Sequence, residues 1–219
     1  MNQLIKCKAV VFDRDGIIID SEILVINSAK KAFKQLGFDM PDADASQIIG
    51  RSSFVYTEYF LTKWDFDPEV FREKMKENFY NELDTVQIFD ETIKLIKRLY
   101  KRKVALAVTT SAGREGTLLI LRNIGIEHMF NEIVTREDCV KLKPDPEPYV
   151  LTTKKLGISP EYCVAIEDTS LGIESAKKAG LKSIAIPTNS SKDQDFANAD
   201  FVVKSANEIE EKLEIITLN

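Results

Sequence analysis

Acidic, hydroxyl and lysine side chains follow four stretches of the sequence that are predicted to be buried strands. Three of the groups come directly where a short apolar run ends, and the lysine lies in the loop after the third run. The groups are Asp13 with Asp15, then Thr109, Thr110 and Ser111, then Lys143, and finally Glu167 with Asp168. Because ligands of open parallel sheets bind beyond the carboxyl ends of the strands, we expect the four groups to meet at one edge of a sheet.

These residue types suit one kind of chemistry. Carboxylates close together repel one another unless a cation neutralises them. Oxygen ligands favour a hard cation such as Mg²⁺, which also accepts phosphate oxygens. An aspartate beside such a metal can attack phosphorus and form an aspartyl-phosphate. A lysine, a hydroxyl and backbone N–H groups can stabilise the transferred group, and a second carboxyl can act as general acid and base. The set therefore indicates metal-assisted phosphoryl transfer.

Short apolar strands alternate with amphipathic helices along most of the chain. Strands are predicted at 8–12, 104–108, 132–135, 163–166, 183–186 and 201–203, and helices at 90–99, 115–124, 148–156, 171–179 and 208–215. This alternation predicts an α/β fold, a Rossmann-like parallel sheet with helices on both faces.

The stretch 18–83 interrupts this alternation with helices only. One of them is predicted to begin at Asp67, an N-cap, with Pro68 in its first turn. We therefore expect a Rossmann-like core formed by 1–17 and 84–219, and a small all-α domain inserted after the first strand.

The composition is that of a soluble protein with a sizeable core. The chain has 219 residues, 44% of them hydrophobic, and a formal net charge of −5. This charge argues against non-specific nucleic-acid binding, which requires a basic face. The apolar runs are too short to span a membrane. The scattered Cys7, Cys139 and Cys163 lack metal-ligand spacing and are typical of reduced thiols. We expect a cytoplasmic monomer that binds neither nucleic acid nor membrane.

Four segments resemble, in order, the motifs of haloacid dehalogenase-like (HAD) phosphatases and phosphomutases. They are FDRDGIIIDSE at 12–22, VTTS at 108–111, KPDP at 143–146 and IEDTSLGI at 166–173. The resemblance covers nearly the whole chain and extends to the helical-cap subfamily of β-phosphoglucomutase and phosphoglycolate phosphatase. One short motif carries little information, but four in order at predicted strand ends are specific.

The resemblance implies a catalytic role and a metal site for the acidic residues. Asp13 would be the nucleophile and a ligand of Mg²⁺. Asp15 would be the general acid and base, and would also give its backbone carbonyl to the metal. Asp168 would complete the metal site, with Glu167 either a ligand or a partner of the ligands.

The resemblance also implies how the phosphate is held. Thr110 would hydrogen-bond it, with Ser111 and Gly16 as further contacts, and Lys143 would neutralise both the phosphate and the nucleophile. Lys141 has the same residue type as Lys143, and only the adjoining proline and the motif order favour Lys143.

The inserted stretch 18–83 would correspond to the mobile helical cap of these enzymes, which closes over the active site and selects the leaving group. Arg51, Ser52 and Lys76 are its predicted substrate contacts. The substrate would be a small phosphorylated metabolite: sugar phosphates, phosphoglycolate and nucleotides all fit.

Two enzyme activities and one non-enzymatic function fit these motifs. In a phosphatase, water resolves the aspartyl-phosphate; in a mutase of the β-phosphoglucomutase type, a sugar hydroxyl does so. The mutases carry a cap histidine and arginine where this chain has Val25 and Ser53, which favours the phosphatase. A response-regulator receiver also combines an acidic pocket with a phosphorylatable aspartate. The insertion and Asp15 argue against it.

Overall fold

Six parallel strands form the main sheet in the computed structural model, which describes residues 4–48 and 53–216. They are β2 (Ala9–Phe12), β5 (Ala105–Thr109), β6 (Glu132–Val134), β7 (Cys163–Glu167), β8 (Lys182–Ala185) and β9 (Phe201–Val202), and their order is β6–β5–β2–β7–β8–β9. Phe12 lies opposite Val108 on one side and Ile166 on the other. The three central strands therefore end at the same level, and the residues after them start from one edge.

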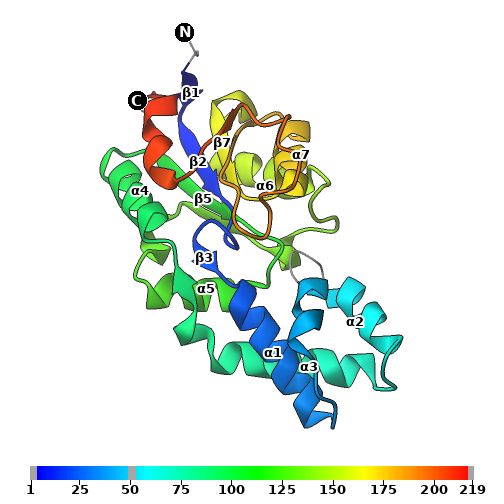
Figure 1. Cartoon of the computed structure of the whole chain (residues 1–219). Coiled ribbons are helices and arrows are strands. Elements are labelled where there is room, and N and C mark those ends of the chain that lie inside the picture. Colours follow the sequence, from blue (N-terminus) through cyan, green and yellow to red (C-terminus); the bar gives the residue numbers. More distant parts are fainter. Residues whose placement is uncertain (1–3, 49–52, 217–219) are drawn as a thin grey trace. The chain divides into compact units, whose positions relative to one another are not determined.

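Helices lie on both faces of this sheet (Figure 1). They are α4 (Asp90–Lys101), α5 (Arg114–Asn123), α6 (Glu147–Leu156) and α7 (Ser170–Lys178). Strands β2 and β5 are buried along their whole length, as expected for apolar runs covered on both sides. On one face, Val11, Ala107 and Ala165 pack with Tyr149 of α6 and Ala176 of α7. The predicted α/β fold class is confirmed.

The chain divides into two compact units, and the smaller one is Asp20–Gln87. It contains α1 (Glu22–Gln35), a 3₁₀ helix (Asp42–Gln47), α2 (Ser53–Leu61), α3 (Pro68–Asn81) and a second 3₁₀ helix (Leu83–Thr85). Its core is aromatic, with Phe33 stacked on Phe71 at 4.2 Å between ring centroids. As predicted, Asp67 caps α3, because its Oδ1 accepts the N–H of Glu69 at 2.8 Å.

The larger unit is formed by Met1–Ile19 and Ile88–Asn219. The chain leaves it through β3 (Ile19–Asp20) and returns through β4 (Gln87–Ile88), and these two short strands pair with each other. Among the helices that the structure describes in either unit, none is long and apolar enough to cross a lipid bilayer.

The predicted helix at 208–215 is wrong. The structure has two short 3₁₀ helices there, Ala206–Glu208 and Glu210–Lys212, followed by β10 (Leu213–Ile215). This strand pairs in parallel with β1 (Ile5–Cys7) at the other end of the chain. The long-range pairing overrides the helical preference of the glutamate-rich segment, as often happens for strands.

Candidate active site

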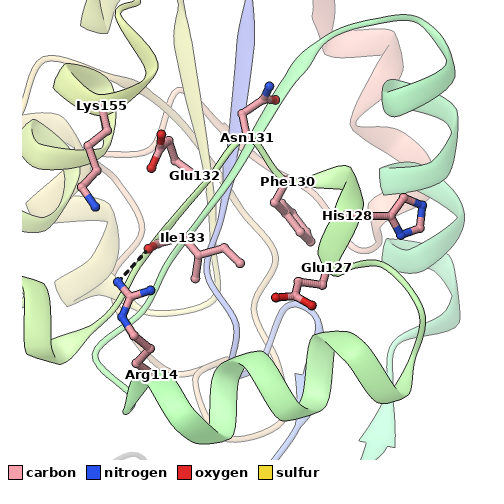
Figure 2. Close-up of a pocket in the computed structure, with 8 residues that line it drawn as sticks. All are labelled: Arg114, Glu127, His128, Phe130, Asn131, Glu132, Ile133 and Lys155. Carbon is pink, nitrogen blue, oxygen red and sulfur yellow. Dashed lines mark hydrogen bonds between the residues drawn. The ribbon is translucent and has the colours of Figure 1, made fainter.

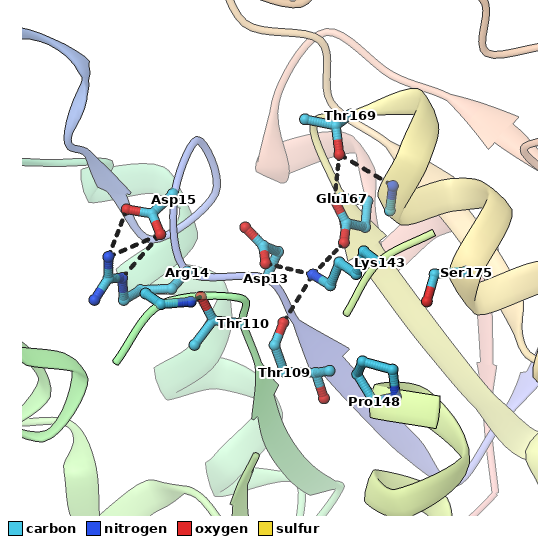
Figure 3. A network of polar contacts seen from close by, with 12 residues as sticks. Asp13, Arg14, Asp15, Thr109, Thr110, Lys143, Pro148, Glu167, Thr169 and Ser175 are labelled. Carbon is cyan, nitrogen blue, oxygen red and sulfur yellow. Dashed lines mark hydrogen bonds and ion pairs between the residues drawn. The ribbon is translucent and has the colours of Figure 1, made fainter. Parts of the chain in front are cut away.

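The ammonium group of Lys143 lies at the centre of a polar cluster at the carboxyl ends of three neighbouring strands (Figure 3). Its Nζ is 2.5 Å from Asp13 Oδ1, just after β2, and 2.5 Å from Glu167 Oε1, at the end of β7. It also donates to the carbonyl of Thr109, the last residue of β5, at 2.9 Å. The lysine side chain is 8% exposed, so these bonds are largely shielded from water. One buried cation thus joins residues of three separate motifs.

The electrostatics of this cluster are dominated by burial. Burial raises the pKa of Asp13 to about 7 against the opposing charge of Lys143, and the charges of Glu167 and Asp15 raise it further. Burial also raises the pKa of Asp168 to about 9, with help from Asp13 and Glu167. Burial alone would lower the pKa of Lys143, but the two carboxylates raise it well above its usual value. When its carboxyl groups are ionised, the cluster carries more negative charge than one ammonium group neutralises, so a further cation would stabilise that ionised form.

Three buried carboxyl groups are placed to hold such a cation. Asp13, Glu167 and Asp168 each offer an oxygen, and these oxygens all lie within 4.8 Å of one another. An all-oxygen set of this size fits a hard divalent cation, which keeps water or substrate oxygens as its other ligands. The residues therefore fit the metal that the sequence predicts.

Two glycines make room for these carboxylates. A Cβ on Gly16 would lie 2.1 Å from Asp168 Oδ2, and a Cβ on Gly172 would lie 2.0 Å from Glu167 Cδ. Gly16 also has a φ of +77°, a conformation that disfavours any other residue. Both backbone segments are therefore packed directly against the acidic cluster.

Replacing Gly172 with alanine is expected to lower the free energy of unfolding by about 1–3 kcal/mol, because the methyl group displaces a buried carboxylate. Without that overlap, the same change within a helix would stabilise the protein. Chemical denaturation measures the difference. Gly113→Ala is the matched control, since a Cβ there would come no closer than 3.2 Å to the end of the Glu137 side chain. Equal stability of the two variants would contradict the tight packing at Gly172.

Glu167 is held by donors on both of its oxygens. Oε1 accepts the Tyr149 hydroxyl at 2.7 Å as well as Lys143, and Oε2 accepts the Thr169 hydroxyl at 3.2 Å. Tyr149 is fully buried in α6, six positions after Lys143. Sequence analysis missed this tyrosine, because an aromatic residue on a helix is typical of a hydrophobic core. These contacts anchor Glu167, and its direct coordination of a metal stays a prediction.

Asp15 is turned toward Arg14 rather than toward Lys143 (Figure 3). The Arg14 Nη2 is 2.8 Å from Asp15 Oδ2 and 2.9 Å from Oδ1. The carboxylates of Asp13 and Asp15, which flank Arg14 in the sequence, are therefore each paired with a different cation: Asp13 with Lys143 and Asp15 with Arg14. Sequence analysis assigned no role to Arg14, although its position between two candidate catalytic residues was a signal.

The residues predicted to bind phosphate occupy different environments. Thr110 follows β5 directly, is 3% exposed, and accepts the Ala112 N–H at 3.1 Å, which leaves its hydroxyl proton for another partner. Ser111 is exposed. The N–H of Gly16 donates to the Ile19 carbonyl at 2.8 Å, so the structure gives this glycine a packing role. Phosphate contacts by Ser111 and Gly16 stay predictions.

The predicted cap contacts are described only in part. Arg51 and Ser52 lie outside the described residues. Lys76 is an exposed residue of α3, and its Nζ lies 5.6 Å from the centroid of the Tyr80 ring. Its role in substrate binding stays a prediction.

An open pocket lies along β6, the edge strand of the sheet (Figure 2). The described residues that line it include none of the strand-end candidates, so it is separate from the cluster around Lys143. Arg114 donates to the carbonyl of Ile133 in β6 at 3.2 Å and forms an ion pair with Asp138. The arginine thus occupies part of the strand's free hydrogen-bonding edge, which disfavours pairing with another chain.

Comparison with known proteins agrees with this geometry. A family model described as haloacid dehalogenase-like hydrolase matches residues 10–186, and the chain belongs to this family of enzymes. It is 26% identical to the phosphorylated carbohydrates phosphatase of Thermotoga maritima, over 81% of this chain and 83% of that one. It is also 25% identical to pyrophosphatase PpaX of Oceanobacillus iheyensis, over 92% and 94% of the two chains.

A solved structure shares the fold. The crystal structure of CbbY from Rhodobacter sphaeroides in complex with phosphate superposes with a TM-score of 0.81, at 23% identity, and covers 93% of this chain and 96% of that one. The resemblance to HAD enzymes inferred from the sequence is confirmed.

Proposed function

We propose that this protein is a Mg²⁺-dependent phosphatase that hydrolyses small phosphorylated metabolites through an aspartyl-phosphate on Asp13. One observation carries the proposal: buried Lys143 contacts both Asp13 and Glu167 at 2.5 Å, beside the carboxyl group of Asp168. Such a site can hold a phosphate only when its negative charge is balanced, by the lysine and by a cation.

In the proposed reaction, an oxygen of Asp13 attacks phosphorus and the leaving alcohol takes a proton from Asp15. Water then attacks the phosphorus and gives a proton to Asp15, and the bond to Asp13 breaks. Lys143 and the Thr110 hydroxyl stabilise the charge on the phosphoryl oxygens. Asp13, Asp168 and the backbone carbonyl of Asp15 would hold the metal, with Glu167 as a further candidate. The metal supplies charge neutralisation and orients the phosphate.

Sugar phosphates are the proposed substrate class. The name of the Thermotoga maritima relative, a phosphorylated carbohydrates phosphatase, supports this choice. We further propose that the helical unit Asp20–Gln87 is the cap domain and, through Arg51, Ser52 and Lys76, takes part in substrate choice. A cytoplasmic monomer that binds no nucleic acid remains the proposal for its cellular state.

³¹P NMR of the protein with Mg²⁺ and a panel of sugar phosphates tests the activity. Growth of inorganic phosphate, abolished by a chelator, is expected. Conversion of a 1-phosphate signal into a 6-phosphate signal without free phosphate would make the protein a mutase and overturn the proposal. A stable aspartyl-phosphate that persists for hours would instead indicate a receiver-like function.

Removing divalent cations is expected to make stability depend on pH. Without metal, Asp13 and Asp168 have folded pKa values of about 7 and about 9, against an ordinary value of 3.8. Above the ordinary value the folded state holds protons that the unfolded state has lost. The free energy of unfolding should therefore fall as pH rises from 5 to 9, by up to about 1.4 kcal/mol per pH unit for each carboxyl.

Urea unfolding in EDTA at a series of pH values measures this slope, and Mg²⁺ should restore more stability at pH 9 than at pH 5. An Asp168→Asn variant is the control, because removing its carboxyl should flatten the upper part of the profile. A wild-type profile in EDTA that does not change between pH 6 and pH 9 would contradict the burial of these two groups.

A further inference from the structure

Arg14 is a buried cation inside the first motif. Only 5% of the residue is exposed, although it lies in a loop between two acidic residues. Its guanidinium contacts both oxygens of Asp15: Nη2 is 2.9 Å from Oδ1, and Nε is 3.1 Å from Oδ2. This fork is the arrangement in which arginine holds a carboxylate most rigidly, since it fixes the plane as well as the distance.

The same guanidinium is anchored on its other side. Its Nη1 donates to the Thr117 hydroxyl of α5 at 3.1 Å, and that hydroxyl donates to the Gly113 carbonyl at 2.8 Å. Asp15 is therefore connected through Arg14 to the first turn of α5. Because the arginine is buried, separating it from Asp15 would leave its positive charge unpaired inside the protein. The fork is therefore a stable part of the larger unit.

We propose that Arg14 is a positioning residue that holds Asp15 as an oriented carboxylate for the step in which water attacks the phosphoryl group. This inference rests on the proposed function. The side chain of Asp15 is 36% exposed despite the fork, so a water molecule can still reach the carboxylate. In this role Arg14 acts through Asp15, the carboxylate that it contacts.

With p-nitrophenyl phosphate as substrate, only the second of the two chemical steps depends on Asp15. In the first step Asp13 attacks phosphorus and the bond to the leaving group breaks; p-nitrophenolate departs as a stable anion and needs no proton from Asp15. In the second step the oxygen of water bonds to phosphorus and its proton passes to Asp15. The bond between phosphorus and Asp13 breaks with its electron pair returning to the aspartate. Only the second step requires Asp15 as a base for this substrate.

The test is rapid-mixing kinetics with p-nitrophenyl phosphate and Mg²⁺, comparing wild type with Arg14→Met. The variant is expected to release a burst of about one equivalent of p-nitrophenolate per active site and then to turn over at least about 10-fold more slowly than the wild type. Its KM should fall together with kcat, so that kcat/KM stays within about threefold. A role in the fold alone would not produce this burst.

Four further variants complete the test. Arg14→Lys keeps the buried charge without the fork, so it should fold and still show the burst. Asp15→Ala should show the same burst, and the double variant Asp15→Ala/Arg14→Met should be no slower than Asp15→Ala alone, because both changes remove one function. Arg122→Met is the matched control, since this arginine of α5 is 60% exposed and pairs with Glu127. It should behave as wild type.

The outcomes separate the two proposals. Equal losses in kcat and kcat/KM for Arg14→Met, or losses that multiply with those of Asp15→Ala, would overturn the positioning role and leave the phosphatase intact. A burst in Asp15→Ala but not in Arg14→Met would do the same. No release of p-nitrophenolate by the wild type would contradict the proposed function and, with it, this inference.

Discussion

The Asp13→Asn variant is expected to fold normally and to lose turnover by about 10⁴-fold or more, because an amide is a poor nucleophile. The change should cost little stability. Lys143 keeps its bonds to Glu167 and to the Thr109 carbonyl, and the amide has almost the shape of the carboxyl that it replaces. The measurements are kcat with p-nitrophenyl phosphate, the melting temperature, and mass spectrometry of acid-quenched protein. Only the wild type should carry a phosphoryl group.

Asp200→Asn is the matched control for this prediction. The Asp200 carboxylate accepts Lys177 Nζ and the Ser183 N–H, each at 2.8 Å, beside β8 rather than at the strand-end cluster. Its loss should lower the melting temperature without changing kcat. Turnover by Asp13→Asn within about tenfold of the wild type would exclude Asp13 as the nucleophile.

The position of the site was predictable because it depends mainly on where strands end. Apolar runs followed by acidic or hydroxyl residues mark the carboxyl ends of buried parallel strands, and a parallel sheet brings these ends to one edge. This reasoning places Asp13, Thr109 and Glu167 near one another without any knowledge of helix packing. The choice of Lys143 over Lys141 came from the adjoining proline and the motif order. The sequence did not decide which of Thr109, Thr110 and Ser111 is the first residue beyond the strand. The structure ends β5 at Thr109, whose carbonyl accepts Lys143, so that Thr110 is the first residue beyond the strand.

The side chains that support the site were not predictable, because their directions depend on tertiary packing. Tyr149 has the spacing of a core residue of α6, and it is one, yet its hydroxyl reaches Glu167. Arg14 stands between two aspartates and has the appearance of a solvated loop residue, although it is buried and contacts α5. Local sequence pattern decides where an element ends. It does not decide which buried polar groups meet across elements.

The Lys143→Met variant is expected to lose about 3–5 kcal/mol of stability near pH 8 and about 10³-fold in kcat, because it leaves buried carboxylates without their cation. Asp13 and Glu167 would then repel each other across the site that the ammonium group occupied. Removal of this charge raises the pKa of Asp13 further above about 7, so the folded variant keeps its proton to higher pH. Both folded proteins keep this proton below about pH 7, so the deficit in stability should be larger at pH 8 than at pH 5, and it should grow only above about pH 7. Urea unfolding in EDTA at both pH values measures it.

Lys141 offers the matched control within the same loop. Its side chain is 70% exposed, and its Nζ lies 3.6 Å from Asp145 Oδ2. Because exposed ion pairs contribute little, Lys141→Met should change the free energy of unfolding by no more than about 0.5 kcal/mol. Lys143→Arg should not restore the wild-type behaviour, because a forked guanidinium cannot replace a compact ammonium group that contacts two carboxylates and a carbonyl. Equal deficits for Lys143→Met at pH 5 and pH 8 would show that the lysine contributes packing rather than charge. The electrostatic account of the site, and the need for a metal that follows from it, would then be wrong.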